Sequence, residues 1–226
     1  MLGFKEMPDE TKSEIPEIQV APERVFAFVD RNNLDRTTKD LLGFAIDWEK
    51  LSQHLRTERT EGRSWMCEKV FIYTGVRELD VVGLTAKHTK QGYEARIRTS
   101  FPQRDKVREH PYICTGCGID GKLVVTSPGA IKSNCDVDLT VDAMQCIDGA
   151  TEFLIFSGDG DFEALIRHSM EHGIRVRIVS NTRRDTNGEK KFSTRLQDLI
   201  ADEIASGKNR ASFIDINDWR KSIEKI

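Results

Sequence analysis

Short apolar runs alternate along the chain with segments in which apolar residues recur at helical spacing. Runs with the length and composition of buried strands lie at residues 25–29, 69–73, 93–98, 152–156 and 174–179. Helical spacing lies at residues 44–56, 78–91, 135–148, 161–172, 193–206 and 217–225. This alternation predicts an α/β fold in which helices cover both faces of a mainly parallel sheet.

The pattern also suggests where the domain begins and ends. Residues 1–22 carry three prolines and little apolar periodicity, which predicts a flexible N-terminal segment. Residues 23–206 form the predicted domain, and residues 207–226 are interpreted as a C-terminal extension. Within the domain, the prolines and glycines of residues 100–130 predict an irregular excursion with a short strand near residues 123–125.

Composition restricts the class of protein. The chain has 226 residues with 34 Lys and Arg against 37 Asp and Glu, a formal net charge of −3. This balance excludes an overall basic nucleic-acid binder but leaves room for a local basic patch. The sequence has no apolar run near the ~20 residues of a membrane span and no signal-peptide core, so we expect a cytoplasmic protein without a membrane partner.

Acidic residues follow two of the predicted strands. Asp30 follows the first strand, and Asp159 and Asp161 follow the strand at 152–156. The helix between them carries Asp136 in its first turn and Asp142 further along. In a parallel sheet the carboxyl ends of the strands share one edge, so these acids are expected to converge there. Taken singly, each acid has another interpretation as a helix N-cap, a turn residue or a solvated helix face.

Converging carboxylates repel one another, and a hard divalent cation is the natural group to offset that repulsion. Mg²⁺ binds oxygen ligands, keeps several waters and takes few carboxylates, often beside substrate phosphate oxygens. The pattern therefore favours phosphodiester chemistry at a divalent metal.

The predicted strands and the acidic residues lie in three sequence motifs. They are VFAFVDRNNL, KSNCDVDLTVDAM and FLIFSGDGDFEALIRHSMEHGIRVRIVS. Together they resemble the NYN domain of the PIN-like nuclease superfamily, in its LabA-like branch, over about residues 24–204. The resemblance implies a three-layer, Rossmann-like (PIN-like) fold and a ribonuclease that depends on Mg²⁺ or Mn²⁺. It is dense over residues 132–180 and weak over residues 60–130.

The resemblance also implies roles for individual residues. The catalytic set is Asp30, Asn33, Asp136, Asp142, Asp159 and Asp161. Four of these acids, Asp30, Asp136, Asp159 and Asp161, are the expected metal ligands. Asn33 is expected to position water or a phosphate oxygen, and Asp142 to support the metal through water. The sequence departs from the family at Cys135, where a glycine or valine is usual.

Two alternatives to an RNA endonuclease stay open at this point. One is a non-catalytic regulatory module of the same fold that binds RNA or protein, and the other is a DNA-directed nuclease. Metal-dependent RNA cleavage that is lost on substitution of Asp159 separates the first alternative from the nuclease.

The cysteines and basic residues suggest two further features. Five cysteines without a signal peptide argue against a disulfide framework. The Cys114-x-x-Cys117 pair has metal-knuckle spacing, and His110 and Cys135 could complete a zinc set, with ordinary thiols as the alternative. Basic residues that could hold a single-stranded RNA backbone are Arg104, Lys106, Arg108, Arg183 and Arg184. The sequence leaves a homo-oligomer open.

Overall fold

A computed structural model describes residues 23–57, 66–127, 131–184, 188 and 190–226. The predicted flexible segment, residues 1–22, lies outside the described residues. None of the described helices is long and apolar enough to cross a membrane.

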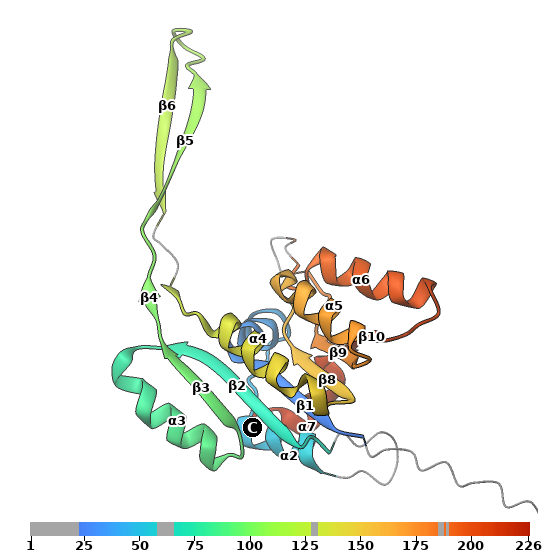
Figure 1. Cartoon of the computed structure of the whole chain (residues 1–226). Helices are drawn as coiled ribbons and strands as arrows, with labels where there is room; N and C mark the ends of the chain where they lie inside the picture. The colour runs from blue at the N-terminus through green and yellow to red at the C-terminus, as the bar shows by residue number, and fades with distance from the viewer. Residues whose placement is uncertain (1–22, 58–65, 128–130, 185–187, 189) are drawn as a thin grey trace, which may run out of the picture.

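A six-stranded parallel sheet forms the centre of the molecule, with the strand order β10-β9-β8-β1-β2-β3 (Figure 1). Its strands are β1 (Val25–Asp30), β2 (Lys69–Val76), β3 (Glu94–Thr99), β8 (Glu152–Phe156), β9 (Arg175–Ser180) and β10 (Ala211–Asp215). The chain builds outward from β1 to β3 on one side and from β8 to β10 on the other. The strand order therefore reverses between β1 and β8, and the crevice at their carboxyl ends is where such sheets bind ligands.

Helices cover both faces of this sheet. They are α1 (Arg31–Asp35), α2 (Trp48–Arg56), α3 (Val81–Lys90), α4 (Cys135–Cys146), α5 (Glu163–Glu171), α6 (Thr194–Ala205) and α7 (Arg220–Ile223). Alternate residues of β1 point to opposite faces, as strand geometry requires. Phe26 and Phe28 pack in a core with α4, α5 and α6, whereas Ala27 and Val29 pack in a second core with α1, α2 and α7. The predicted three-layer α/β fold is confirmed.

Short turns connect these elements. A π-helical turn, η1 (Arg36–Leu41), continues α1. The 3₁₀ turns are η2 (Glu78–Asp80), η3 (Ile147–Gly149), η4 (Gly160–Phe162) and η5 (Ile216–Trp219).

The described residues of the 100–130 segment leave the sheet as predicted, and the predicted short strand at residues 123–125 lies within β6 (Asp120–Ser127), but the segment is a regular β-hairpin where an irregular excursion was predicted. β5 (Lys106–Ile113) pairs antiparallel with β6, and the hairpin projects away from the sheet (Figure 1). At its base, β4 (Phe101–Pro102) pairs with β7 (Ile131–Lys132). Each strand of a two-stranded ribbon is an edge strand, so Pro111 is tolerated within β5.

The predicted C-terminal extension also differs from the structure. β10 pairs with β9 at the edge of the central sheet, and Ile216 and Ile223 are buried in the same core as β1. These residues therefore complete the sheet and its cover. The prediction missed β10 because this edge strand is only partly buried and lacks a continuous apolar run.

A buried histidine in α3 predicts a pH dependence of stability. His88 packs edge-on against Trp48 and Tyr93, and its Nε2 lies 3.1 Å from Arg31 Nη1. Burial, and then the positive charge of Arg31, lower the pKa of His88 to about 4. The histidine of the unfolded chain takes up a proton near pH 6.5. The free energy of unfolding that the neutral His88 contributes is therefore fully present above that pH.

Acidification from pH 6.5 toward 4 is therefore expected to lower the free energy of unfolding. His88→Phe keeps an aromatic ring in place and should flatten this part of the profile, measured by denaturant unfolding at each pH. His172→Gln, at an exposed histidine, serves as the matched control. Equal slopes in wild type and His88→Phe would show that His88 is not the group responsible.

Candidate active site

Asp30 lies where β1 ends and α1 begins, and both of its oxygens are engaged. Oδ1 accepts a hydrogen bond from Asn33 N at 3.1 Å, so Asp30 is the N-cap of α1. Oδ2 accepts a hydrogen bond at 3.2 Å from the Oγ of Ser157, the residue that directly follows β8. The N-cap interpretation is thus confirmed for this residue, and the same carboxylate also binds Ser157 at the end of β8.

The turn after β8 is fixed by a chain of short contacts. Ser157 Oγ accepts from Asp159 N at 3.2 Å, and Asp159 Oδ1 accepts from Asp161 N at 3.0 Å. Gly158 N donates to Asn33 Oδ1 at 3.0 Å and ties this turn to α1. Because Asn33 Oδ1 is engaged, the atom that Asn33 can offer to a bound anion is Nδ2, a donor.

The turn packs against residues 191–193, and this requires glycine at position 158. A Cβ added to Gly158 would lie 2.4 Å from the backbone oxygen of Lys191, and Ser193 N donates to Gly158 O at 2.9 Å. Lys191 and Ser193 therefore lie directly beside the acidic turn.

A cavity of about 490 Å³ opens at this edge of the sheet, between the ends of β1 and β8. It brings together five of the six predicted catalytic residues, namely Asp30, Asn33, Asp136, Asp159 and Asp161. Asp136 reaches it from the first turn of α4. Sequence reasoning missed Arg36, which also lines the cavity and follows Asn33 by three residues, on the same side of the helix.

The carboxylates that line the cavity repel one another. Burial raises the pKa of Asp30 to about 6, opposed by the hydrogen bonds from Asn33 and Ser157 and increased by the charges of Asp136 and Asp159. A carboxylate under this influence gains from a nearby cation. In the described part of the chain, no three His, Cys, Asp or Glu side chains form a group that could hold a metal ion.

That arrangement fits a hydrated Mg²⁺ or Mn²⁺ better than a metal enclosed by protein ligands. Mg²⁺ typically takes one or two carboxylates, keeps several waters and binds substrate phosphates. Asp30, Asp136, Asp159 and Asp161 offer oxygen donors of this kind around one cavity.

The structure does not bring Asp142 to the cavity, so its predicted supporting role is wrong. Asp142 is buried, accepts from Tyr73 Oη at 3.0 Å and pairs with Arg96 Nε at 2.9 Å. Asp142 follows Asp136 by six positions in the helix, which places the two on different sides of α4. Burial, and then Asp142, raise the pKa of Tyr73, so the phenol stays protonated and donates.

The predicted four-ligand zinc set is not assembled either. Cys114 and Cys117 lie at the tip of the β5–β6 hairpin, and His110 lies within β5 opposite Leu123. Cys135 is buried at the start of α4 and lines the acidic cavity. The start of α4 lies near the base of the hairpin, away from its tip (Figure 1). The prediction failed because the excursion extends as a hairpin and does not fold back.

The predicted RNA-binding residues are spread over two regions. Arg104 and Arg108 are exposed near the base of the hairpin, and the side chain of Lys106 lies outside the described residues. Arg183 and Arg184 are exposed after β9, where Arg184 Nη1 donates to Gly188 O at 2.7 Å. None of these four described arginines lines the acidic cavity.

Other basic residues do lie beside the acids. A second cavity, of about 390 Å³, is lined by Asp159 and Asp161 together with Lys190, Lys191 and Arg195. Arg195 Nη1 lies 3.8 Å from Asp161 Oδ1. These cations follow β9 in the chain, and only the folded turn shows that they lie beside the acids.

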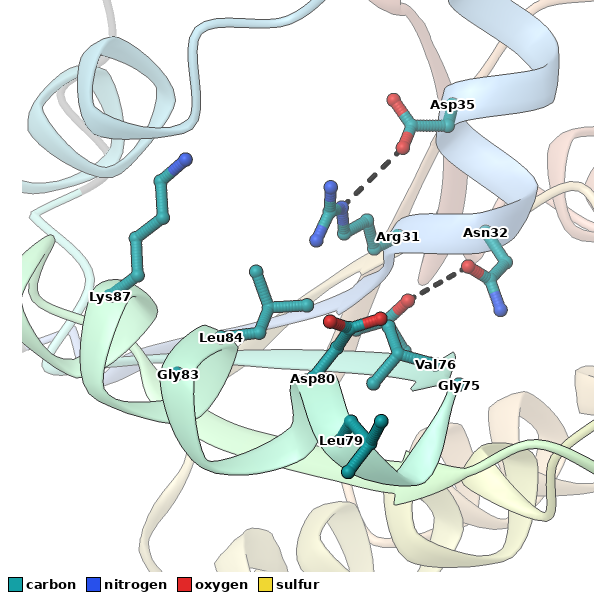
Figure 2. A pocket seen from close by; sticks show the side chains of 11 residues that line it. Arg31, Asn32, Asp35, Gly75, Val76, Leu79, Asp80, Gly83, Leu84 and Lys87 are labelled. Atoms are coloured by element: carbon teal, nitrogen blue, oxygen red, sulfur yellow. Dashed lines mark hydrogen bonds and ion pairs between the residues drawn. The ribbon is translucent and has the colours of Figure 1, made fainter.

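A third cavity, of about 530 Å³, adjoins the acidic one between α1 and α3 and shares Asn32, Asp35 and Gly75 with it. Figure 2 shows Arg31 beside Asp35 on one wall and Lys87 on the other. Thr74 Oγ1 donates to Asn32 Oδ1 at 2.8 Å and fixes the amide between the two cavities. An extended ligand could thus continue from one cavity into the next.

Comparisons with known proteins agree with this fold. The family model for the NYN domain matches residues 24–204. The Low amplitude and bright protein LabA of Synechococcus elongatus is 31% identical over 94 residues, 42% of this chain and 41% of that protein. The match thus spans about two fifths of the length of this relative. A crystal structure of a protein of unknown function from Vibrio parahaemolyticus has a TM-score of 0.53 at 18% identity, covering 90% of this chain and 96% of that one. This structural similarity shows the fold alone.

Proposed function

The chain belongs to the NYN domain family, and from this premise we propose that it is a metal-dependent ribonuclease that cleaves single-stranded RNA internally. The observation that carries the proposal is the meeting of Asp30 and Asp159 at the reversal of strand order, with Asp136 and Asp161 lining the same cavity. Acids alone would repel a phosphate, so the proposal requires a divalent cation between protein and substrate.

The chain's own residues would prepare the substrate for in-line attack. Asp30 is held rigidly by Asn33 N and Ser157 Oγ, so its orientation requires no adjustment when substrate binds. Asn33 Nδ2 can donate to a phosphate oxygen, and Arg36 can offset developing negative charge. When bound, Mg²⁺ or Mn²⁺ would lower the pKa of the attacking water and stabilise the leaving oxygen.

Purified protein tests the proposal directly. Single-stranded RNA labelled at one end is incubated with Mg²⁺ or Mn²⁺, with EDTA, and in parallel with single-stranded DNA of the same sequence. We expect internal cleavage of RNA that EDTA abolishes. Cleavage of DNA in preference to RNA would reassign the substrate, and the absence of metal-dependent cleavage of either would contradict the proposal.

A non-catalytic binding module of the same fold is the second candidate. It is favoured by the absence, in the described part of the chain, of three acids grouped closely enough to form a complete metal site. Such a module would bind RNA or protein and would not cleave RNA in the presence of any divalent metal ion.

The basic residues beside the acidic turn give a prediction about binding. The double variant Lys190→Glu with Arg195→Glu should weaken RNA binding. The salt slope, which is the slope of the logarithm of the binding constant against the logarithm of the salt concentration, should fall in magnitude by roughly 1.4, because each phosphate contact to a single strand contributes about 0.7. Filter binding over a range of salt concentrations measures both quantities.

The matched control is Lys208→Glu with Lys225→Glu, which changes the same charge at exposed positions outside both acid-lined cavities. It should leave the salt slope close to that of wild type. Arg104→Glu with Arg108→Glu tests the predicted RNA contacts on the hairpin, and a drop in slope in that variant alone would place the RNA path there.

A further inference from the structure

The tip of the β5–β6 hairpin is a tight turn that carries two thiols. Cys114 and Cys117 flank Thr115 and Gly116, and Cys114 O accepts a hydrogen bond from Gly118 N at 2.8 Å. Gly118 has φ +71°, a left-handed conformation that glycine adopts without strain. The turn therefore fixes the backbone on both sides of the cysteine pair.

The same turn directs backbone donors at a sulfur atom. The amides of Cys117 and Gly116 hydrogen-bond to the Cys114 thiol, and the Cys117 side chain also faces it. Adjacent sulfurs with amide donors behind one of them are a donor set for a soft or borderline metal such as Zn²⁺.

This pair supplies only half of a structural zinc site, which takes four ligands in a tetrahedron. Within the described ranges no third His, Cys, Asp or Glu joins the pair to make a metal-binding group. The other cysteines, Cys67, Cys135 and Cys146, lie on the main body and not on the hairpin. A complete zinc site at this turn would therefore take its remaining ligands from outside the described residues of this chain.

We propose that two copies of this chain join at their hairpin tips around one Zn²⁺, with Cys114 and Cys117 of each copy as its four ligands. A two-fold axis through the metal gives each copy the same contacts, which is the usual symmetry of a homodimer. This proposal does not rest on the proposed nuclease function, because Cys114 and Cys117 do not line the acidic cavity.

The surroundings of the turn favour a second copy as the occupant. Ile113 and Ile119 flank the turn and are 69% and 68% exposed, although apolar side chains of this size gain from burial. An isolated two-stranded hairpin is marginally stable in water, and this one projects alone from the body (Figure 1). Lys122 Nζ pairs with Glu109 Oε2 at 2.8 Å, so the ribbon below the turn carries no block of like charge that would repel an identical ribbon.

The test is a zinc titration of the reduced full chain, followed by light scattering. With excess Mg²⁺ present to fill the proposed site in the acidic cavity, we expect saturation at one Zn²⁺ for two chains and a twofold increase in mass, which EDTA reverses. Co²⁺ in place of Zn²⁺ should give the absorption spectrum of a tetrathiolate site. Cys114→Ser with Cys117→Ser should abolish metal binding at this site and the increase in mass.

Two control variants make the outcome specific. Cys146→Ser alters a half-buried thiol of α4 and should leave the zinc-dependent dimer intact. Asp159→Asn alters the acidic cavity and should also leave it intact, so a failure of the nuclease proposal and of this one are distinguishable. Saturation at one Zn²⁺ per chain without a change in mass, the absence of zinc binding, or an equal increase in mass in the double-serine variant would each overturn the proposal.

Discussion

Asp159→Asn is expected to reduce metal-dependent RNA cleavage by at least about a hundredfold, the usual scale for removing one electrostatic contact at a catalytic centre. Asparagine keeps the Oδ1 that accepts from Asp161 N, so the turn after β8 should retain its shape. The substitution also removes a negative charge that raises the pKa of Asp30. In metal-free buffer the variant should therefore be as stable as wild type or more stable. Cleavage rates and thermal unfolding of the same preparation measure the two effects together.

The control for this variant is Asp148→Asn. Asp148 is exposed in η3, before β8 begins, and so lies near the opposite edge of the sheet. It should leave cleavage unchanged. Wild-type cleavage by Asp159→Asn, with contaminating nuclease excluded, would remove Asp159 from the mechanism.

Asp142→Ala is expected to lower the free energy of unfolding by roughly 1–3 kcal/mol, the range for leaving a buried hydrogen-bond donor without its partner. The substitution leaves Tyr73 Oη without its acceptor and the half-buried Arg96 without its counter-charge. A domain of this size has a total stability of only about 5–15 kcal/mol, so the loss is a large share of it. Denaturant unfolding at neutral pH measures the difference.

Asp138→Ala provides the comparison from the same helix. Asp138 pairs with Arg98, whose side chain is 58% exposed, and exposed pairs contribute about 1 kcal/mol or less. Asp142→Asn separates structure from catalysis, because its amide oxygen can still accept from Tyr73. This variant should keep most of its cleavage activity. Loss of cleavage at wild-type stability would return Asp142 to the catalytic set.

The sequence predicts the central strands well because burial on both faces leaves a visible pattern. β1 and β8 are continuous apolar runs, since helices cover each face of the sheet. The positions of Asp30 and Asp159 follow from the same logic, because residues after parallel strands meet at one edge.

The edges of the molecule were harder to predict for the same physical reason. β5 and β6 are exposed on both faces, so no alternation of apolar and polar residues marks them, and Pro111 and Gly121 resemble loop residues. β10 pairs on one side only and is partly buried. The role of Asp142 depends on Tyr73 and Arg96, which come from two other strands and cannot be read from the helix alone.

The most direct test of the acidic cavity is the location of a bound metal. Crystals of the full chain would be soaked in Mn²⁺, and anomalous diffraction would locate the ion. We expect a peak in the cavity between the ends of β1 and β8, with Asp30 or Asp159 among the ligands of the ion at about 2.0–2.2 Å. Asp159→Asn crystals soaked in the same way should show a weaker peak or none. Mn²⁺ bound elsewhere at saturating concentration, with no peak in this cavity, would show that the acidic cavity is not a metal site.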